Sequence, residues 1–231
     1  MRFATFTTKP SRREILWGGI YLVLYISVLP LAVPLAAMFL LPGLNEAQIN
    51  FLYFGLNFAA TTVIFRRYLI ESLKDSLLVG FPTLWYALLG YLGSMLLSGM
   101  VVSAILEVYP EFMNVNDSTI GAIASQNLPL MFIGGVILAP VTEELLFRGL
   151  IFRGLYDRSP LIAHVLTMVL FSLIHVSGYI GMYDTKLLFF CFLQYLVPGY
   201  CLNFAYQQSG TIVSSILMHM VTNLVAFSAM R

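Results

Sequence analysis

Long runs of apolar residues alternate with short polar segments along this chain of 231 residues. Most runs reach the ~18–20 residues that an α-helix needs to cross the hydrocarbon core of a bilayer. Pro30 and Pro34 predict a kink in the first run, because proline has no N–H to donate within a helix. The pattern predicts seven membrane-spanning helices, with a margin of one, over residues 15–41, 49–65, 82–106, 128–155, 160–177, 187–206 and 211–229.

The composition supports the membrane class. Hydrophobic residues make up 59% of the chain and charged residues only 10%, whereas soluble domains carry about 25% charged residues. The expected fold is all-α: an integral, multi-pass membrane helix bundle of about seven transmembrane helices, in one domain over residues 1–231. Gly90, Ser94 and Ser98 recur every four residues and predict close packing against another helix. A net charge of +1 gives no reason to expect a nucleic-acid partner; the expected environment is membrane lipid.

Basic residues predict the orientation in the membrane. With a cytoplasmic amino terminus, ten of the twelve Lys and Arg residues lie on or towards the inner side, and only Lys186 and Arg231 lie outside. Cytoplasmic loops of membrane proteins carry such an excess, so we expect the amino terminus in the cytoplasm. The ten inner residues are Arg2, Lys9, Arg12, Arg13, Arg66, Arg67, Lys74, Arg148, Arg153 and Arg158.

The segment "APVTEELLFRGL", residues 139–150, places Glu143, Glu144 and Arg148 inside an apolar run. A charged side chain at the bilayer centre costs roughly 2.5–3.5 kcal/mol on insertion scales, and such residues are functional candidates by default. Residues four apart share a helix face, so Glu144 and Arg148 can form an ion pair. Glu143 is five residues from Arg148 and points to another face, where it needs a different partner. Pro140 predicts a bend or an opening in this helix.

Two later predicted helices carry polar pairs of their own. "FSLIH" places Phe171 and His175 on one face, and "HMVTN" places His219 and Asn223 on one face. Counted from the helix ends at 1.5 Å per residue, Glu143 and these three polar groups lie at mid-depth, within about 10 Å of one another along the membrane normal. We expect them to line a mid-membrane polar active-site cavity that admits water.

Hydrolysis is the chemistry that suits this set. A carboxylate in a partly desolvated pocket can act as a general base on water. An imidazole and an amide one helical turn apart, as in His219 and Asn223, offer two donors for a developing oxyanion. Alternatively, Glu143, His175 and His219 could bind a divalent metal that activates water. Both readings predict cleavage of a peptide or similar acyl bond, and the chain has no HExxH, GxSxG or phosphate-binding glycine loop to support another reaction.

The ordered motifs EExxxR, FxxxH and HxxxN resemble the CAAX protease and bacteriocin-processing family (CPBP, or Abi) of intramembrane endopeptidases. The resemblance covers residues 128–229 as a catalytic core; residues 1–127, the amino-terminal transmembrane helices, match only in being helical and apolar. It implies that Glu143 activates water with help from His175, and that His219 and Asn223 form the oxyanion site. Glu144 and Arg148 would support this geometry, together with Phe171 of the second motif.

Expectations for cofactor and substrate follow from the same resemblance, whereas the carrier alternative and the water route follow from the positions of the polar and basic residues. Family members are often labelled metalloproteases, but we favour a glutamate base without a cofactor; zinc, if bound, would take Glu143, His175 and His219 as ligands. The expected substrate is a membrane-associated peptide or protein, with a lipidated protein, a bacteriocin leader and a signal peptide as candidates. A non-proteolytic immunity or scaffold protein of the same fold is the alternative, and a proton-coupled carrier is a second one. The shortest aqueous route to Glu143 is expected from the cytoplasmic face or laterally between helices.

Overall fold

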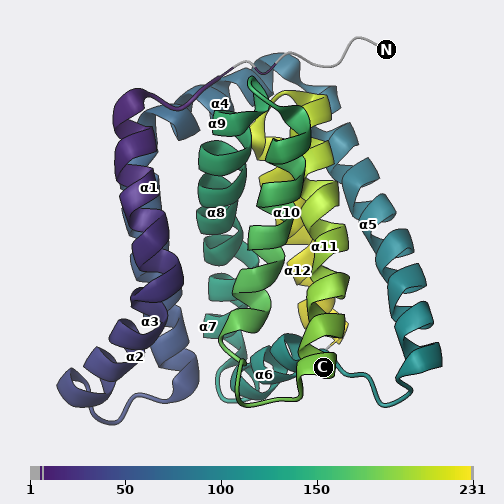
Figure 1. Ribbon diagram of the computed structural model, residues 1–231. Helices are drawn as coiled ribbons and strands as arrows, with labels where there is room; N and C mark the ends of the chain where they lie inside the picture. The colour runs from purple at the N-terminus through teal and green to yellow at the C-terminus, as the bar shows by residue number, and fades with distance from the viewer. Residues whose placement is uncertain (1–5, 7, 230–231) are drawn as a thin grey trace.

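The computed structural model describes residue 6 and residues 8–229, and over this part of the chain it is a bundle of helices without a β-strand (Figure 1). Arg2 and Arg231, which entered the orientation argument, lie outside the described residues. The elements are α1 (Arg12–Ser27), α2 (Leu29–Leu40), α3 (Glu46–Ile64), α4 (Arg66–Val79), α5 (Phe81–Val108), α6 (Val115–Ala124), α7 (Leu128–Phe132), η1 (Ile133–Leu138), α8 (Ala139–Glu144), η2 (Leu145–Phe152), α9 (Arg153–Tyr156), α10 (Pro160–Ser177), α11 (Thr185–Ser209) and α12 (Ile212–Ala229).

The helical spans predicted from the apolar runs are confirmed in their main features. Five helices of the described chain are long and apolar enough to cross a membrane, and the total rises to seven if each of two bent pairs counts as one span. The pair α1 and α2 bends by 64°, next to Pro30 as expected, and the pair α3 and α4 bends by 82°. In both pairs the two helices are long and apolar enough to cross a membrane only when they are taken together.

Basic residues gather at one end of the bundle. The start of α1, the helix α4 and the short α9 lie together at the end where the chain begins, which we call the α4 end (Figure 1). The opposite end, which we call the α6 end, is formed by α6 and by the connections from α2 to α3 and from α10 to α11. Lys186, at the start of α11, is the basic residue placed at the α6 end by the order of the helices.

The continuous span Leu128–Tyr156 lies at the centre of the bundle. In its most apolar window 67% of the residues are buried, compared with 17–39% in the other four long spans. Its neighbours are therefore protein side chains rather than lipid, which is the setting in which a membrane protein can hold charged groups. Two stretches of this span, η1 and η2, are π-helical. Such segments are rare and frequently occur at functional sites.

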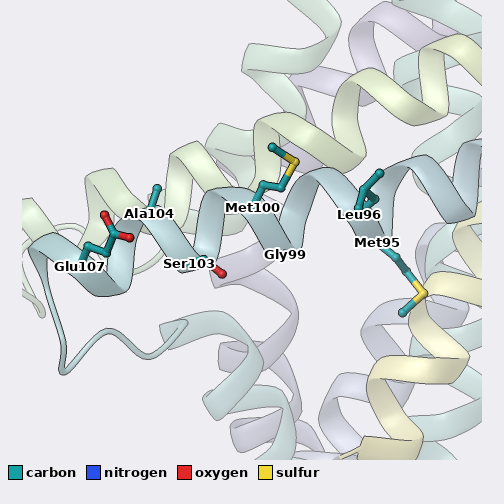
Figure 2. A pocket seen from close by; sticks show the side chains of 7 residues that line it. All are labelled: Met95, Leu96, Gly99, Met100, Ser103, Ala104 and Glu107. Atoms are coloured by element: carbon teal, nitrogen blue, oxygen red, sulfur yellow. The ribbon is translucent and has the colours of Figure 1, made fainter.

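The small-residue stripe on α5 packs against α11 and α12, as predicted. Gly90 and Ser94 are buried, and a Cβ atom on Gly90 would lie 2.7 Å from Sδ of Met218 and 3.2 Å from Cβ of Ala205. Further along α5 a shallow hollow of about 580 Å³ opens on the helix (Figure 2). None of the charged residues of the central span lines it; its walls are Met95, Leu96, Gly99, Met100, Ser103, Ala104 and Glu107.

Candidate active site

The ion pair predicted from helical spacing is present. Nη1 of Arg148 donates to Oε1 of Glu144 over 3.0 Å, and both side chains have no exposed surface. The other two guanidinium nitrogens also donate: Nη2 to the carbonyl of Gly199 over 2.8 Å and Nε to Oδ1 of Asn203 over 3.1 Å. Arg148 thus meets the rule that a buried charge must be paired and hydrogen-bonded.

Asn203 is a residue of this network that the sequence reasoning missed. It lies on α11, is fully buried, and donates from Nδ2 to the carbonyl of His164 over 3.3 Å. It therefore links Arg148 to α10 as well as to α11. One feature of the sequence indicated this role: Asn203 is an amide inside an apolar span, and polar side chains in spans tend to hydrogen-bond across helices. No spacing rule, however, connects positions 148 and 203.

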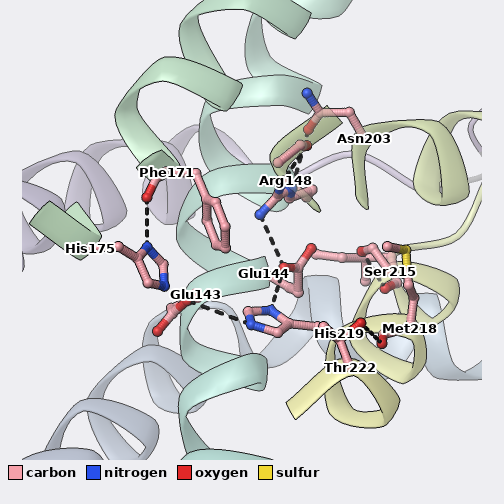
Figure 3. A network of polar contacts seen from close by, with 12 residues as sticks. Glu143, Glu144, Arg148, Phe171, His175, Asn203, Ser215, Met218, His219 and Thr222 are labelled. Carbon is pink, nitrogen blue, oxygen red and sulfur yellow. Dashed lines mark hydrogen bonds and ion pairs between the residues drawn. The ribbon is translucent and has the colours of Figure 1, made fainter. Parts of the chain in front are cut away.

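His219 lies between the two glutamates (Figure 3). Its Nδ1 is 2.9 Å from Oε1 of Glu144, and its Nε2 is 3.9 Å from Oε2 of Glu143. Oε2 of Glu143 is buried and makes no hydrogen bond in the described structure. The prediction that Glu144 is occupied by Arg148 while Glu143 points elsewhere is confirmed.

His175 approaches the same carboxylate from α10. Its ring is close enough to Glu143 for the two groups to interact electrostatically. Nδ1 of His175 is 2.8 Å from the carbonyl of Phe171, one turn earlier, so this nitrogen carries the hydrogen and Nε2 is left free. The ring of Phe171 packs edge-on against His219 with centroids 5.7 Å apart, and the guanidinium of Arg148 lies 4.5 Å from the centre of that ring. Phe171 therefore contacts both histidines and covers the ion pair.

Asn223 is bound to the backbone of the central span. Its Nδ2 donates to the carbonyl of Gly135 over 2.8 Å. The N–H of Ala139 donates to the carbonyl of Gly134, five residues earlier. The next donor in this π-helical register would be residue 140, but Pro140 has no N–H, so the Gly135 carbonyl has lost its helical partner. The opening predicted at Pro140 is thus filled by an amide from α12.

The amino-terminal helices add two tyrosines to the surroundings of Glu143. Tyr25 of α1 and Tyr53 of α3 both interact electrostatically with Glu143, and their rings stack with centroids 6.3 Å apart. Asn57 hydrogen-bonds to this pair of helices: its Oδ1 accepts from the hydroxyl of Tyr21 over 2.8 Å, and its Nδ2 donates to the carbonyl of Tyr53 over 2.7 Å. Sequence reasoning missed these residues, since single tyrosines in apolar helices carry no distinguishing pattern.

The donor groups do not fit a metal ion in this conformation. Among the described residues no three His, Cys, Asp or Glu side chains converge as metal ligands. Glu143, His175 and His219, the ligand set expected for zinc, approach one another without forming such a cluster.

Comparison with known proteins shows which proteins this chain is similar to. Residues 125–225 match the family model described as "Type II CAAX prenyl endopeptidase Rce1-like". The chain is 29% identical to the Bacillus subtilis protein named "Putative membrane peptidase YdiL" over 153 residues, which are 65% of this chain and 56% of the relative. It is also 29% identical to "UPF0177 protein YxdF" of Lactococcus lactis over 97 residues, 41% of this chain and 47% of the relative.

The chain spans about half the length of these curated relatives. No solved structure matches it. The matched segment contains all three motifs and the central span that carries the buried charges. Through residues 125–225, the chain is similar to the Rce1-like CAAX prenyl endopeptidases, in agreement with the resemblance drawn from its motifs.

Proposed function

We propose that this protein is an intramembrane endopeptidase that hydrolyses a peptide bond of a membrane-associated peptide or protein. One observation carries the proposal: of two adjacent buried glutamates, only Glu144 forms an ion pair with Arg148. Glu143 is left with an oxygen that has no hydrogen-bond partner and faces His219 across 3.9 Å. A buried carboxylate with a free oxygen is suited to accept a proton from water.

In the proposed reaction, Glu143 takes a proton from a water molecule, and the oxygen of that water attacks the substrate carbonyl. The free Nε2 of His175 helps to orient the water. The same proton then passes from Glu143 to the nitrogen of the leaving group as the C–N bond breaks. This cycle returns Glu143 to its starting state and balances the proton.

His219 serves the oxyanion in this proposal. Its Nδ1 is held by Glu144, so its Nε2 is aimed at the side of Glu143 where the substrate carbonyl would lie. When protonated, Nε2 donates to the developing oxyanion, and the Glu144 carboxylate stabilises the imidazolium, as a buried carboxylate does in a catalytic triad. Asn223 has one N–H bound to Gly135 and keeps a second amide hydrogen for the same oxyanion.

The test is a cleavage assay on purified protein in lipid nanodiscs. Candidate substrates are a prenylated peptide, the same peptide without the lipid, and a bacteriocin leader peptide, each with and without an excess of chelator. We expect cleavage that survives chelation. Glu143→Gln should lower kcat by about 10²–10⁴-fold, the usual contribution of a general base, while thermal unfolding stays unchanged.

Glu111→Gln is the matched control, because Glu111 is an exposed carboxylate outside the spans. Normal turnover by Glu143→Gln would refute the assignment of the base. Loss of activity on chelation, restored by one zinc per chain, would replace the metal-free mechanism. Absence of cleavage by the unaltered protein on every substrate class would favour the immunity or scaffold role.

A further inference from the structure

The imidazole of His175 contacts two aromatic rings. The ring centroid of Phe171 lies 4.6 Å away in a tilted contact, and that of Tyr195, from α11, lies 4.3 Å away in a stacked contact with an interplanar angle of 27°. The hydrogen bond from Nδ1 to the Phe171 carbonyl sets which nitrogen is free. That bond alone leaves the ring able to pivot about its axis, and stacking against Tyr195 removes this freedom.

The hydroxyl of Tyr195 is itself fixed by hydrogen bonds. The hydroxyl donates to Oδ1 of Asp117 over 2.7 Å and accepts from Nδ2 of Asn116 over 2.9 Å. Oδ1 of Asn116 in turn accepts from the hydroxyl of Tyr179 over 3.3 Å. A tyrosine that only filled space would need one partner for its hydroxyl; this one has a donor and an acceptor from a single helix, α6.

The tether comes from outside the matched family segment. Both Asn116 and Asp117 lie in the first turn of α6, before residue 125. Asn114 caps this helix with its side chain and also donates to Gln194, the residue before Tyr195, over 2.9 Å. Burial raises the pKa of Asp117, while the hydrogen bond from Tyr195 opposes that shift. The start of α6 is thus joined to α11 at two successive residues.

We propose that Tyr195, held through its hydroxyl by Asp117, is a positioning residue that fixes the plane of His175 and the direction of its free Nε2. The inference rests on the proposed function, in which His175 orients the attacking water. In this proposal α6, a short helix outside the spans, fixes the orientation of a histidine of the spanning helix α10. Asp117 acts through Tyr195, and neither residue needs to contact the substrate.

Four substitutions separate the ring from its tether. Tyr195→Leu removes the stacked ring and should lower kcat by about 100-fold, the scale of a misplacement of about 1 Å in a catalytic group. Tyr195→Phe keeps the ring and removes every hydrogen bond of its hydroxyl, whereas Asp117→Ala keeps the ring and removes only the bond to Asp117. Asp117→Ala should lower kcat by about three- to tenfold, as expected for one hydrogen bond, and Tyr195→Phe by at least as much. Asp117→Asn keeps an acceptor oxygen for the hydroxyl and should restore near-normal kcat. KM should stay within about twofold throughout, because substrate contacts are unchanged.

Tyr179→Phe is the matched control. It removes a hydroxyl that binds the same Asn116 but belongs to a ring that does not stack on His175. Normal kcat is expected for this variant. The proposal is overturned if Tyr195→Leu retains more than half of the kcat, or if Tyr179→Phe lowers kcat as much as Tyr195→Phe.

A second readout does not depend on peptide cleavage. The chain has three histidines, so the ring nitrogen and proton resonances of ¹⁵N-histidine-labelled protein can be assigned with single substitutions. Loss of the Tyr195 ring should shift the His175 resonances and leave those of His164 in place; unchanged His175 resonances in both Tyr195→Leu and Tyr195→Phe would overturn the proposal. If these resonances move while no peptide is cleaved by the unaltered protein, the positioning stands and the proposed function fails.

Discussion

Arg148 shows how a fully buried charge is tolerated in an apolar helix. Every guanidinium nitrogen has an acceptor, and only the one from Glu144 is charged. We predict that Glu144→Gln destabilises the protein by about 3–5 kcal/mol, because removal of one partner leaves the other charge buried and uncompensated. Thermal unfolding in detergent measures this loss.

The control for this prediction is Glu71→Gln. Glu71 forms the same i, i+4 pair with Arg67, but both side chains are more than 40% exposed. Its loss should therefore cost less than about 1 kcal/mol. Equal effects of the two substitutions would contradict the view that burial makes the Glu144 pair indispensable.

Asn223 and Pro140 form a residue-scale pair that the structure explains. We predict that Asn223→Ala lowers the free energy of unfolding by about 1–3 kcal/mol, because the buried carbonyl of Gly135 then has no donor. In a Pro140→Ala background, where residue 140 regains an N–H, the same substitution should cost clearly less. A double-mutant cycle on thermal unfolding measures the difference. Additive effects of the two substitutions would show that the hydrogen bond from Asn223 does not compensate for the N–H that Pro140 lacks.

At the scale of elements, glycine at position 90 sets how closely α5 approaches α11 and α12. Gly90→Leu should destabilise the bundle by about 1–3 kcal/mol through overpacking, since even a Cβ would meet Met218 and Ala205. Gly93→Leu is the control, because a Cβ there meets nothing within 4 Å. Thermal unfolding of the two variants compares them directly, and an equal loss in both would locate the packing constraint elsewhere.

The π-helical stretches are the second feature at this scale. They change which residues share a face, so a face argument based on 3.6 residues per turn holds only locally. The argument was right for Glu144 and Arg148, because residues only four apart remain close enough to form an ion pair. It gave no information on Gly135, whose carbonyl depends on the register of η1.

At the scale of the whole molecule, the two ends of the bundle differ in polarity. Towards the α4 end the central span is covered by buried aromatic residues: Phe65, Tyr68, Phe152 and Tyr206 are at most 1% exposed. Towards the α6 end, Asn116 and Asp117 hydrogen-bond to the hydroxyl of Tyr195, whose ring stacks on His175. The sequence argument placed the water route at the basic end or laterally between helices; from the polar residues near His175 we propose a route from the α6 end instead.

Cysteine labelling tests this access. In a background without the two buried cysteines, Cys191 and Cys201, Glu143→Cys should react faster with a membrane-impermeant thiol reagent applied to the face that carries α6. Lys74→Cys on α4 and Glu111→Cys before α6, both exposed positions, report which face the reagent reaches. The positive-inside bias predicts that Lys74→Cys is cytoplasmic. Faster reaction of Glu143→Cys from the α4 face would restore the sequence-based route.

The sequence by itself determined the membrane class, the helical spans and the pairing of Glu144 with Arg148. These properties depend on local quantities: the length of an apolar run, the helical repeat, and the distance between residues four apart. The motif histidines could likewise be assigned to α10 and α12, because each lies within one apolar run.

Only the tertiary structure decided which distant groups complete the site. Asn203 meets Arg148 across 55 residues, Tyr195 meets Asp117 across 78, and Asn223 meets Gly135 across 88. Such contacts depend on how helices cross and rotate against one another, and one amide or tyrosine in an apolar run fits many arrangements equally well. The packing of α6, α11 and α12 around the central span selects one arrangement, because it is the one that gives each of these buried polar groups a partner.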